Sequence, residues 1–91
     1  MMRGPKMILC CGEALVDMLP RQTPDGEAAF APHAGGAVFN TAIALGRLGL
    51  NAGLFTGLSD DLFGIVLTDA LSASNVGSQL AARSDRPTTL A

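Results

Sequence analysis

The sequence predicts an α/β fold built on a parallel sheet. Two observations support this prediction: extended apolar runs alternate with segments of helical periodicity, and the first of these runs is apolar along almost its whole length. Strand–helix–strand alternation is typical of parallel sheets with right-handed crossovers. A strand that is covered on both faces has a near-continuous apolar sequence.

The first predicted strand covers residues 7–15, a run rich in Met, Ile, Leu and Cys. Proline and glycine then interrupt the chain, and residues 27–32 are expected to form a short extended segment. Pro20 and Pro32 argue against a central strand in this excursion, because proline cannot donate a hydrogen bond to a sheet ladder.

A helix is expected after the Gly35–Gly36 pair, since apolar residues recur at helical spacing from position 38 to position 48. Gly49 is a typical C-terminal stop for such a helix. Residues 50–58 predict a second strand, because this run is again largely apolar.

Ser59 or Asp60 is expected to cap a second helix. This helix should end at Asn75 and Gly77. Two further extended pieces are expected at residues 79–82 and 88–91, with a turn between them.

Composition bounds the class of protein. The 91 residues are 48% apolar and 15% charged, against a usual charged share of about a quarter. Either the fold is compact and rich in alanine, or some apolar faces pack against a partner, and we favour the second interpretation. A net charge of −2 and the absence of Trp and Tyr argue against a nucleic-acid partner. Every apolar stretch is shorter than the about 20 residues of a membrane span, so the expected location is the cytoplasm.

Gly35, Gly36 and Asn40 form the first candidate site. Two glycines at a helix start permit unusual backbone angles and close approach by a ligand. The free N–H groups of the first turn and the amide of Asn40 would suit a ligand with several hydroxyls. The alternative is a tight turn in which Asn40 bonds locally.

Acidic residues and one histidine give weaker candidates. Asp17 follows the first strand, where ligands of open α/β sheets bind, although a solvated turn carboxylate is the alternative. Glu13 has the same two interpretations. Asp60 and Asp61 are better explained as helix caps than as an acid–base pair, and His33 as a loop residue without catalytic neighbours.

Four motifs and a final segment occur in the order and at the spacing of the PfkB (ribokinase-like) carbohydrate kinases. They are residues 12–17 (GEALVD), 34–42 (AGGAVFNTA), 45–49 (LGRLG), 58–64 (LSDDLFG) and 85–91 (DRPTTLA). The chain therefore resembles the N-terminal part of that family's domain over nearly all of residues 1–91. The resemblance implies a ribokinase-like, Rossmann-type α/β/α sheet with a small β lid, contributed here by residues 18–33 and 78–91.

The resemblance also implies residue roles. Asp17 matches the family's aspartate that binds sugar hydroxyls, Gly35 and Gly36 match the di-glycine hinge of the lid, and Asn40 matches a sugar-contacting asparagine. Ribokinases carry Lys after the di-glycine, whereas this chain has Ala37, so ribose is disfavoured. The run is most similar to fructokinase-type members, with 2-keto-3-deoxygluconate kinase as a near rival.

The family's catalytic aspartate lies in a Gly-Ala-Gly-Asp motif, which does not occur in these 91 residues. We therefore expect no catalytic, cofactor-binding or metal residue here. ATP and Mg²⁺ would be bound mainly by a part of a longer protein that follows this segment. The expected activity is ATP-dependent phosphorylation of a sugar hydroxyl, with a homodimer formed through the lid as a possible assembly. A non-catalytic sugar-binding or dimerisation fragment is the alternative from another class.

Overall fold

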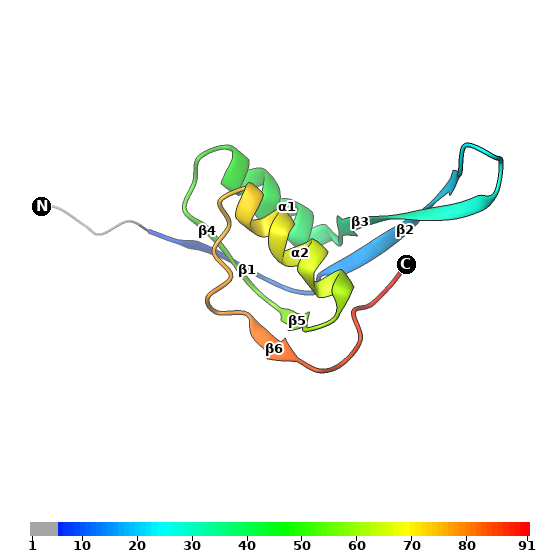
Figure 1. Cartoon of the computed structure of the whole chain (residues 1–91). Helices are drawn as coiled ribbons and strands as arrows, with labels where there is room; N and C mark the ends of the chain where they lie inside the picture. Colours follow the sequence, from blue (N-terminus) through cyan, green and yellow to red (C-terminus); the bar gives the residue numbers. More distant parts are fainter. Residues whose placement is uncertain (1–5) are drawn as a thin grey trace, which may run out of the picture.

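Residues 6–91 are described by a computed structural model (Figure 1). In chain order the elements are β1 (Ile8–Cys11), β2 (Leu15–Gln22), β3 (Ala28–Gly35), α1 (Ala37–Arg47), β4 (Ala52–Phe55), β5 (Gly57–Ser59), α2 (Leu62–Ala73) and β6 (Ala82–Ser84). The predicted alternation of strands and helices is confirmed.

The strands joined through helices are parallel, as the sequence predicts. β1 pairs with β4 in parallel, and β5 pairs with β6 in parallel. Gly77 adds an isolated parallel bridge to Gly53 on the edge of β4 that faces away from β1. The segment after α2 therefore runs beside β4 and β5 and extends the parallel arrangement.

A single first strand over residues 7–15 is wrong. β1 ends at Cys11 and β2 begins at Leu15. At Gly12 the chain passes close under α1, where a Cβ atom would lie 2.7 Å from a methyl group of Val38. The backbone leaves β4 at this point, with Gly12 N–H donating a last bond to the carbonyl of Phe55 at 3.2 Å.

Residues 15–35 form a regular antiparallel hairpin, which is longer than the short extended segment expected at residues 27–32. The ladder runs from Leu15 opposite Gly35 to Gln22 opposite Ala28. Gly26, with φ +83°, forms the turn. Pro20 and Pro32 lie inside these strands, but only where one edge of the strand is unpaired among residues 6–91. Because proline cannot donate a backbone hydrogen bond, Pro20 and Pro32 disfavour the pairing of a further strand at these positions of the hairpin.

The strand predicted over residues 50–58 is also wrong as a single element. It divides at Thr56, because β4 pairs with β1 whereas β5 pairs with β6. The Thr56 carbonyl accepts from the Ala82 amide at 2.9 Å, which is where the partner changes. The extended piece expected at residues 79–82 lies instead at Ala82–Ser84.

Both predicted helices are present. Gly49 (φ +84°) and Asn75 (φ +58°) end them in left-handed conformations, as expected. Of the candidate caps Ser59, Asp60 and Asp61, the N-cap of α2 is Asp61, since its carboxylate accepts from the Gly64 amide at 2.8 Å. Ser59 instead accepts from the Asp61 amide at 3.1 Å.

The core lies between the two helices and the strands. α1 packs on β1 and β4, and α2 packs on β5 and on the hairpin (Figure 1). The buried apolar residues that form one cluster are Ala14, Val16, Phe39, Ala42, Leu54, Leu58, Leu67, Leu71 and Val76. No helix within residues 6–91 is long and apolar enough to span a bilayer.

Large apolar side chains remain exposed on β1 and β4. Ile8 and Leu9 are 45% and 43% exposed, and Phe55 at the end of β4 is 51% exposed. These side chains are available for packing, which agrees with the low share of charged residues in the sequence.

Candidate functional site

Asp17 and Gly35 touch across the hairpin. Asp17 lies on β2 opposite His33 of β3, and Gly35 is the last residue of β3. A Cβ atom at position 35 would collide with the Oδ2 atom of Asp17. The glycine therefore leaves the space that the Asp17 carboxylate occupies.

Gly36 forms the N-cap of α1 with φ +106° and ψ +141°, a backbone conformation that residues other than glycine rarely adopt. Within residues 6–91 no side chain caps this helix, and its first turn holds no acidic residue. The N–H groups of the first turn are thus left for water or a ligand. By contrast, α2 is capped by Asp61.

Asn40 lies in the first turn of α1, where its backbone N–H donates to the Gly36 carbonyl at 2.8 Å. Its exposed side chain lines a hollow of about 290 Å³ between α1 and α2, together with Ala34 and Arg47. Asp17 does not line this hollow. The structure therefore brings Asp17, Gly35 and Gly36 together and places Asn40 one helical turn away in a neighbouring space.

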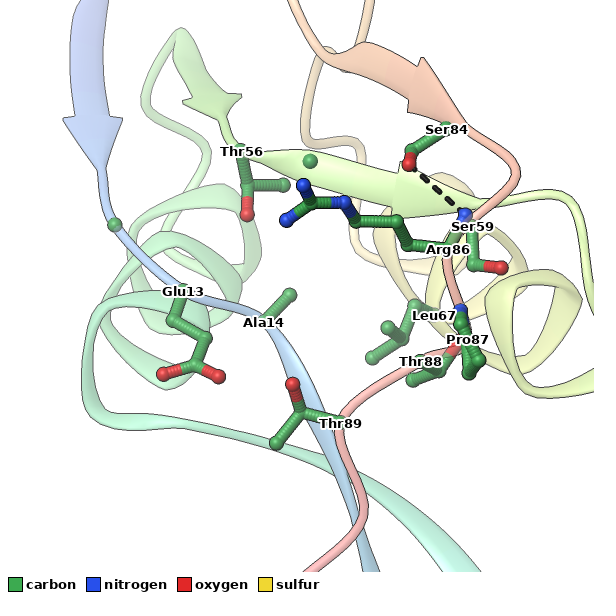
Figure 2. A pocket seen from close by; sticks show the side chains of 12 residues that line it. Glu13, Ala14, Thr56, Ser59, Leu67, Ser84, Arg86, Pro87, Thr88 and Thr89 are labelled. Atoms are coloured by element: carbon green, nitrogen blue, oxygen red, sulfur yellow. Dashed lines mark hydrogen bonds between the residues drawn. The ribbon is translucent and has the colours of Figure 1, made fainter.

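A second hollow of about 270 Å³ lies where β1 and β4 end (Figure 2). Its polar lining includes Glu13, Thr56, Arg86 and Thr89. Figure 2 shows the Arg86 side chain extending across the hollow toward Thr56, which is only 6% exposed. The carboxyl ends of parallel strands are the usual place for ligands in open α/β sheets.

Sequence reasoning singled out Glu13 in this hollow but missed Thr56, Arg86 and Thr89. These three residues lie up to 33 positions apart (89 − 56) and no local pattern connects them. Tertiary contacts, the parallel pairing of β5 with β6 among them, bring residues 84–89 over the ends of β1 and β4.

Asp61 holds the wall of this hollow. Its Oδ1 atom accepts from the Thr88 hydroxyl at 2.6 Å, and its Oδ2 atom accepts from the Thr88 amide at 2.8 Å. These two bonds, the hydroxyl first, together with the bond from Gly64, lower the pKa of Asp61 to about 2. Hydrogen bonds to the charged form stabilise it, so Asp61 is ionised at neutral pH.

The described residues do not fit a magnesium–nucleotide site. Within residues 6–91 no three His, Cys, Asp or Glu side chains gather where they could share a metal ion. Both oxygens of the Asp61 carboxylate already accept hydrogen bonds, from Thr88 and Gly64.

The parallel strands, the hairpin and the di-glycine start of α1 define a ribokinase-like α/β segment. The chain belongs to the pfkB family of carbohydrate kinases, whose profile matches residues 5–91.

Two members of this family are similar to the chain over most of its length. A fructokinase of Rhizobium leguminosarum bv. trifolii is 61% identical over 85 residues, which are 93% of this chain and 26% of that protein. The crystal structure of a fructokinase from Xylella fastidiosa with bound ATP is 37% identical, with a TM-score of 0.85 over 94% of this chain and 28% of that one.

A 2-dehydro-3-deoxygluconokinase from Thermotoga maritima shares the fold with a TM-score of 0.80 at 23% identity, over 92% of this chain and 26% of that one. The chain thus spans about a quarter of the length of the relatives it matches.

Proposed function

We propose that this chain is the sugar-binding part of an ATP-dependent kinase that phosphorylates a sugar hydroxyl, with a ketose such as fructose as the substrate. The observation that carries the proposal is the contact of the Asp17 carboxylate with Gly35, beside the uncapped N-terminus of α1. A carboxylate accepts two hydroxyl hydrogen bonds, and free N–H groups donate to further oxygens. The similarity to fructokinases supports fructose.

In this proposal the chain positions the sugar and does not move the phosphate. Asp17 and Asn40 bind sugar hydroxyls, and Gly36 is the hinge between the hairpin and α1. ATP and Mg²⁺ are bound by protein outside these residues, in the cytoplasm, where ATP is available. Phosphoryl transfer depends mainly on positioning and electrostatic stabilisation, so holding the acceptor is a substantial share of catalysis.

We further propose that residues 18–33 and 78–91 contribute to a lid over the sugar. Figure 1 supports the first of these two segments, since the β2–β3 hairpin projects beyond both helices. A lid excludes water and so limits wasteful hydrolysis of ATP. Phe30, which is 62% exposed on the hairpin, supports pairing of two lids in a homodimer. In that case Phe30→Asp in the full-length protein yields monomers in sedimentation analysis, and an unchanged mass would remove the dimer proposal.

A sugar acid such as 2-keto-3-deoxygluconate is the second candidate substrate. Arg86 extends into the hollow at the ends of β1 and β4, where a guanidinium group can pair with a carboxylate. Glu13 lines the same hollow and opposes an anion, which favours a neutral sugar. A coupled assay of the full-length protein with fructose, 2-keto-3-deoxygluconate and ribose distinguishes these substrates.

The site is tested by Asp17→Ala and Asn40→Ala in the full-length protein. We expect the sugar KM to rise about tenfold or more, because each change removes hydrogen bonds to the ligand. The ATP KM should stay the same. Asp69→Ala is the matched control, since Asp69 is an exposed carboxylate on α2. An unchanged sugar KM in both variants would refute the site, and phosphorylation of none of the sugars would leave the non-catalytic alternative.

A further inference from the structure

Asp61 does more than cap a helix. A cap needs one carboxylate oxygen, and Oδ1 meets that need by accepting from the Gly64 amide at 2.8 Å. Oδ2 is directed to a segment 27 residues further along the chain, where it accepts from the Thr88 amide at 2.8 Å. Oδ1 also accepts from the Thr88 hydroxyl at 2.6 Å. Both oxygens therefore hold Thr88.

Thr88 directly precedes the segment that pairs with β2. The Val16 amide donates to the Thr89 carbonyl at 3.0 Å, and the Ala91 amide donates to the Val16 carbonyl at 2.9 Å. The Met18 amide then donates to the Ala91 carbonyl at 2.8 Å. Residues 89–91 thus bond to β2 on both sides of Asp17.

These bonds give the strand of Asp17 its second edge. β3 pairs with one edge of β2, and residues 89–91 pair with the other between Val16 and Met18. A strand whose backbone is hydrogen-bonded on both edges opens locally less often than one that is free on one edge, so its side chains are held more firmly in place. Without the second edge, the Asp17 carboxylate would be held by the hairpin alone.

We propose that Asp61 is a positioning residue for sugar binding, which holds the Asp17 strand in place through Thr88 and residues 89–91. The proposal rests on the sugar-binding function proposed above. Asp61 does not touch the sugar in this scheme. It fixes the segment that fixes the strand, and it also holds the wall of the hollow that Thr88 and Thr89 line (Figure 2).

The test uses Asp61→Asn and Thr88→Val in the full-length protein, with Asp60→Asn as the matched control. Thr88→Val removes the hydroxyl bond alone and keeps the helix cap, so it stays informative if Asp61→Asn does not fold. Asp60 is exposed, and its carboxylate makes no hydrogen bond to another side chain within residues 6–91. Thr88→Ser restores the hydroxyl and should behave as the unaltered protein.

Amide hydrogen exchange gives the first readout, because it does not depend on activity. We expect exchange at Val16, Met18 and Ala91 to be about tenfold faster in both test variants and unchanged in Asp60→Asn. Unchanged exchange at these amides in both variants would overturn the proposal, regardless of the kinetic constants of the variants.

Kinetics gives the second readout. The sugar KM should rise about fivefold to tenfold in both variants, with kcat and the ATP KM unchanged. The reason is that binding of the sugar is weakened equally in the ground state and in the transition state. Faster exchange with an unchanged sugar KM would reduce Asp61 to a structural role and overturn the proposal. Asp17→Ala in the same assay separates the two hypotheses: if it too leaves the sugar KM unchanged, the proposed sugar site fails first.

Discussion

The carboxylate of Asp61 binds Thr88 through both of its oxygens, at 2.6 and 2.8 Å. This contact joins the start of α2 to the segment that follows β6. It also has a consequence for acid stability, since the ionised form of Asp61 is the one that accepts these bonds.

Acid should weaken the fold through Asp61. Its pKa falls from 3.8 to about 2 because the folded protein hydrogen-bonds the charged form. A lowered carboxylate pKa gives stability that is complete above pH 3.8 and is lost as the pH falls toward about 2. We expect Asp61→Asn to be less stable than the unaltered protein at pH 5, with the difference shrinking toward pH 2.5. Urea midpoints followed by far-UV circular dichroism measure this, and a constant difference across that range would contradict it.

Gly36→Ala should destabilise the protein by about 1–3 kcal/mol, because alanine at φ +106° is strained. The new Cβ would also lie 3.0 Å from the Glu13 carbonyl oxygen. Gly57→Ala is the control, since position 57 has no positive φ and, within residues 6–91, a Cβ there would meet no atom within 4 Å beyond its chain neighbours. Urea unfolding of both variants should show a loss only for Gly36→Ala, and equal midpoints would refute the strain argument.

Gly35→Ala should impair sugar binding more than stability. The added methyl group would take the space of the Asp17 Oδ2 atom and turn this carboxylate away from its present direction. We expect the sugar KM of the full-length protein to rise about tenfold, as for loss of a hydrogen bond that a sugar hydroxyl donates to a charged group. A normal sugar KM with a displaced Asp17, checked by crystallography, would separate Asp17 from sugar binding.

Much of the fold follows from local sequence. Apolar spacing predicts α1 and α2, and Gly49 and Asn75 end them through the left-handed conformations that they favour. The parallel sheet follows from the strand–helix order. The glycines at positions 35 and 36 lie where the sequence placed them, at the start of α1.

The errors arise where a strand changes partner. Residues 50–58 are largely apolar, so nothing local indicates that pairing passes from β1 to β6 at Thr56. The hairpin was obscured by Pro20 and Pro32, which are tolerated because their strands are unpaired on one edge at those points within the described chain. The link from Asp61 to Thr88 spans 27 residues and depends on the tertiary fold alone.

Gly46 should be the glycine on which the contact of the two helices depends. It is buried in α1, and a Cβ there would collide with the carbonyl oxygen of Ser74, which is the C-cap of α2, and would lie 2.8 Å from a methyl group of Val76. Alanine is the better helix former by about 1 kcal/mol, so propensity alone predicts that Gly46→Ala stabilises the protein. We expect instead a net loss of about 3 kcal/mol, because backbone atoms cannot yield to the added methyl group.

Ala44→Gly, on the exposed side of the same helix, measures the propensity term by itself and should lower stability by about 1 kcal/mol. Urea unfolding of the two variants separates the two effects. Gly46→Ala could instead unfold at a higher urea concentration than the unaltered protein. In that case the two helices move apart without loss of stability, and the close contact at Gly46 does not determine how they pack.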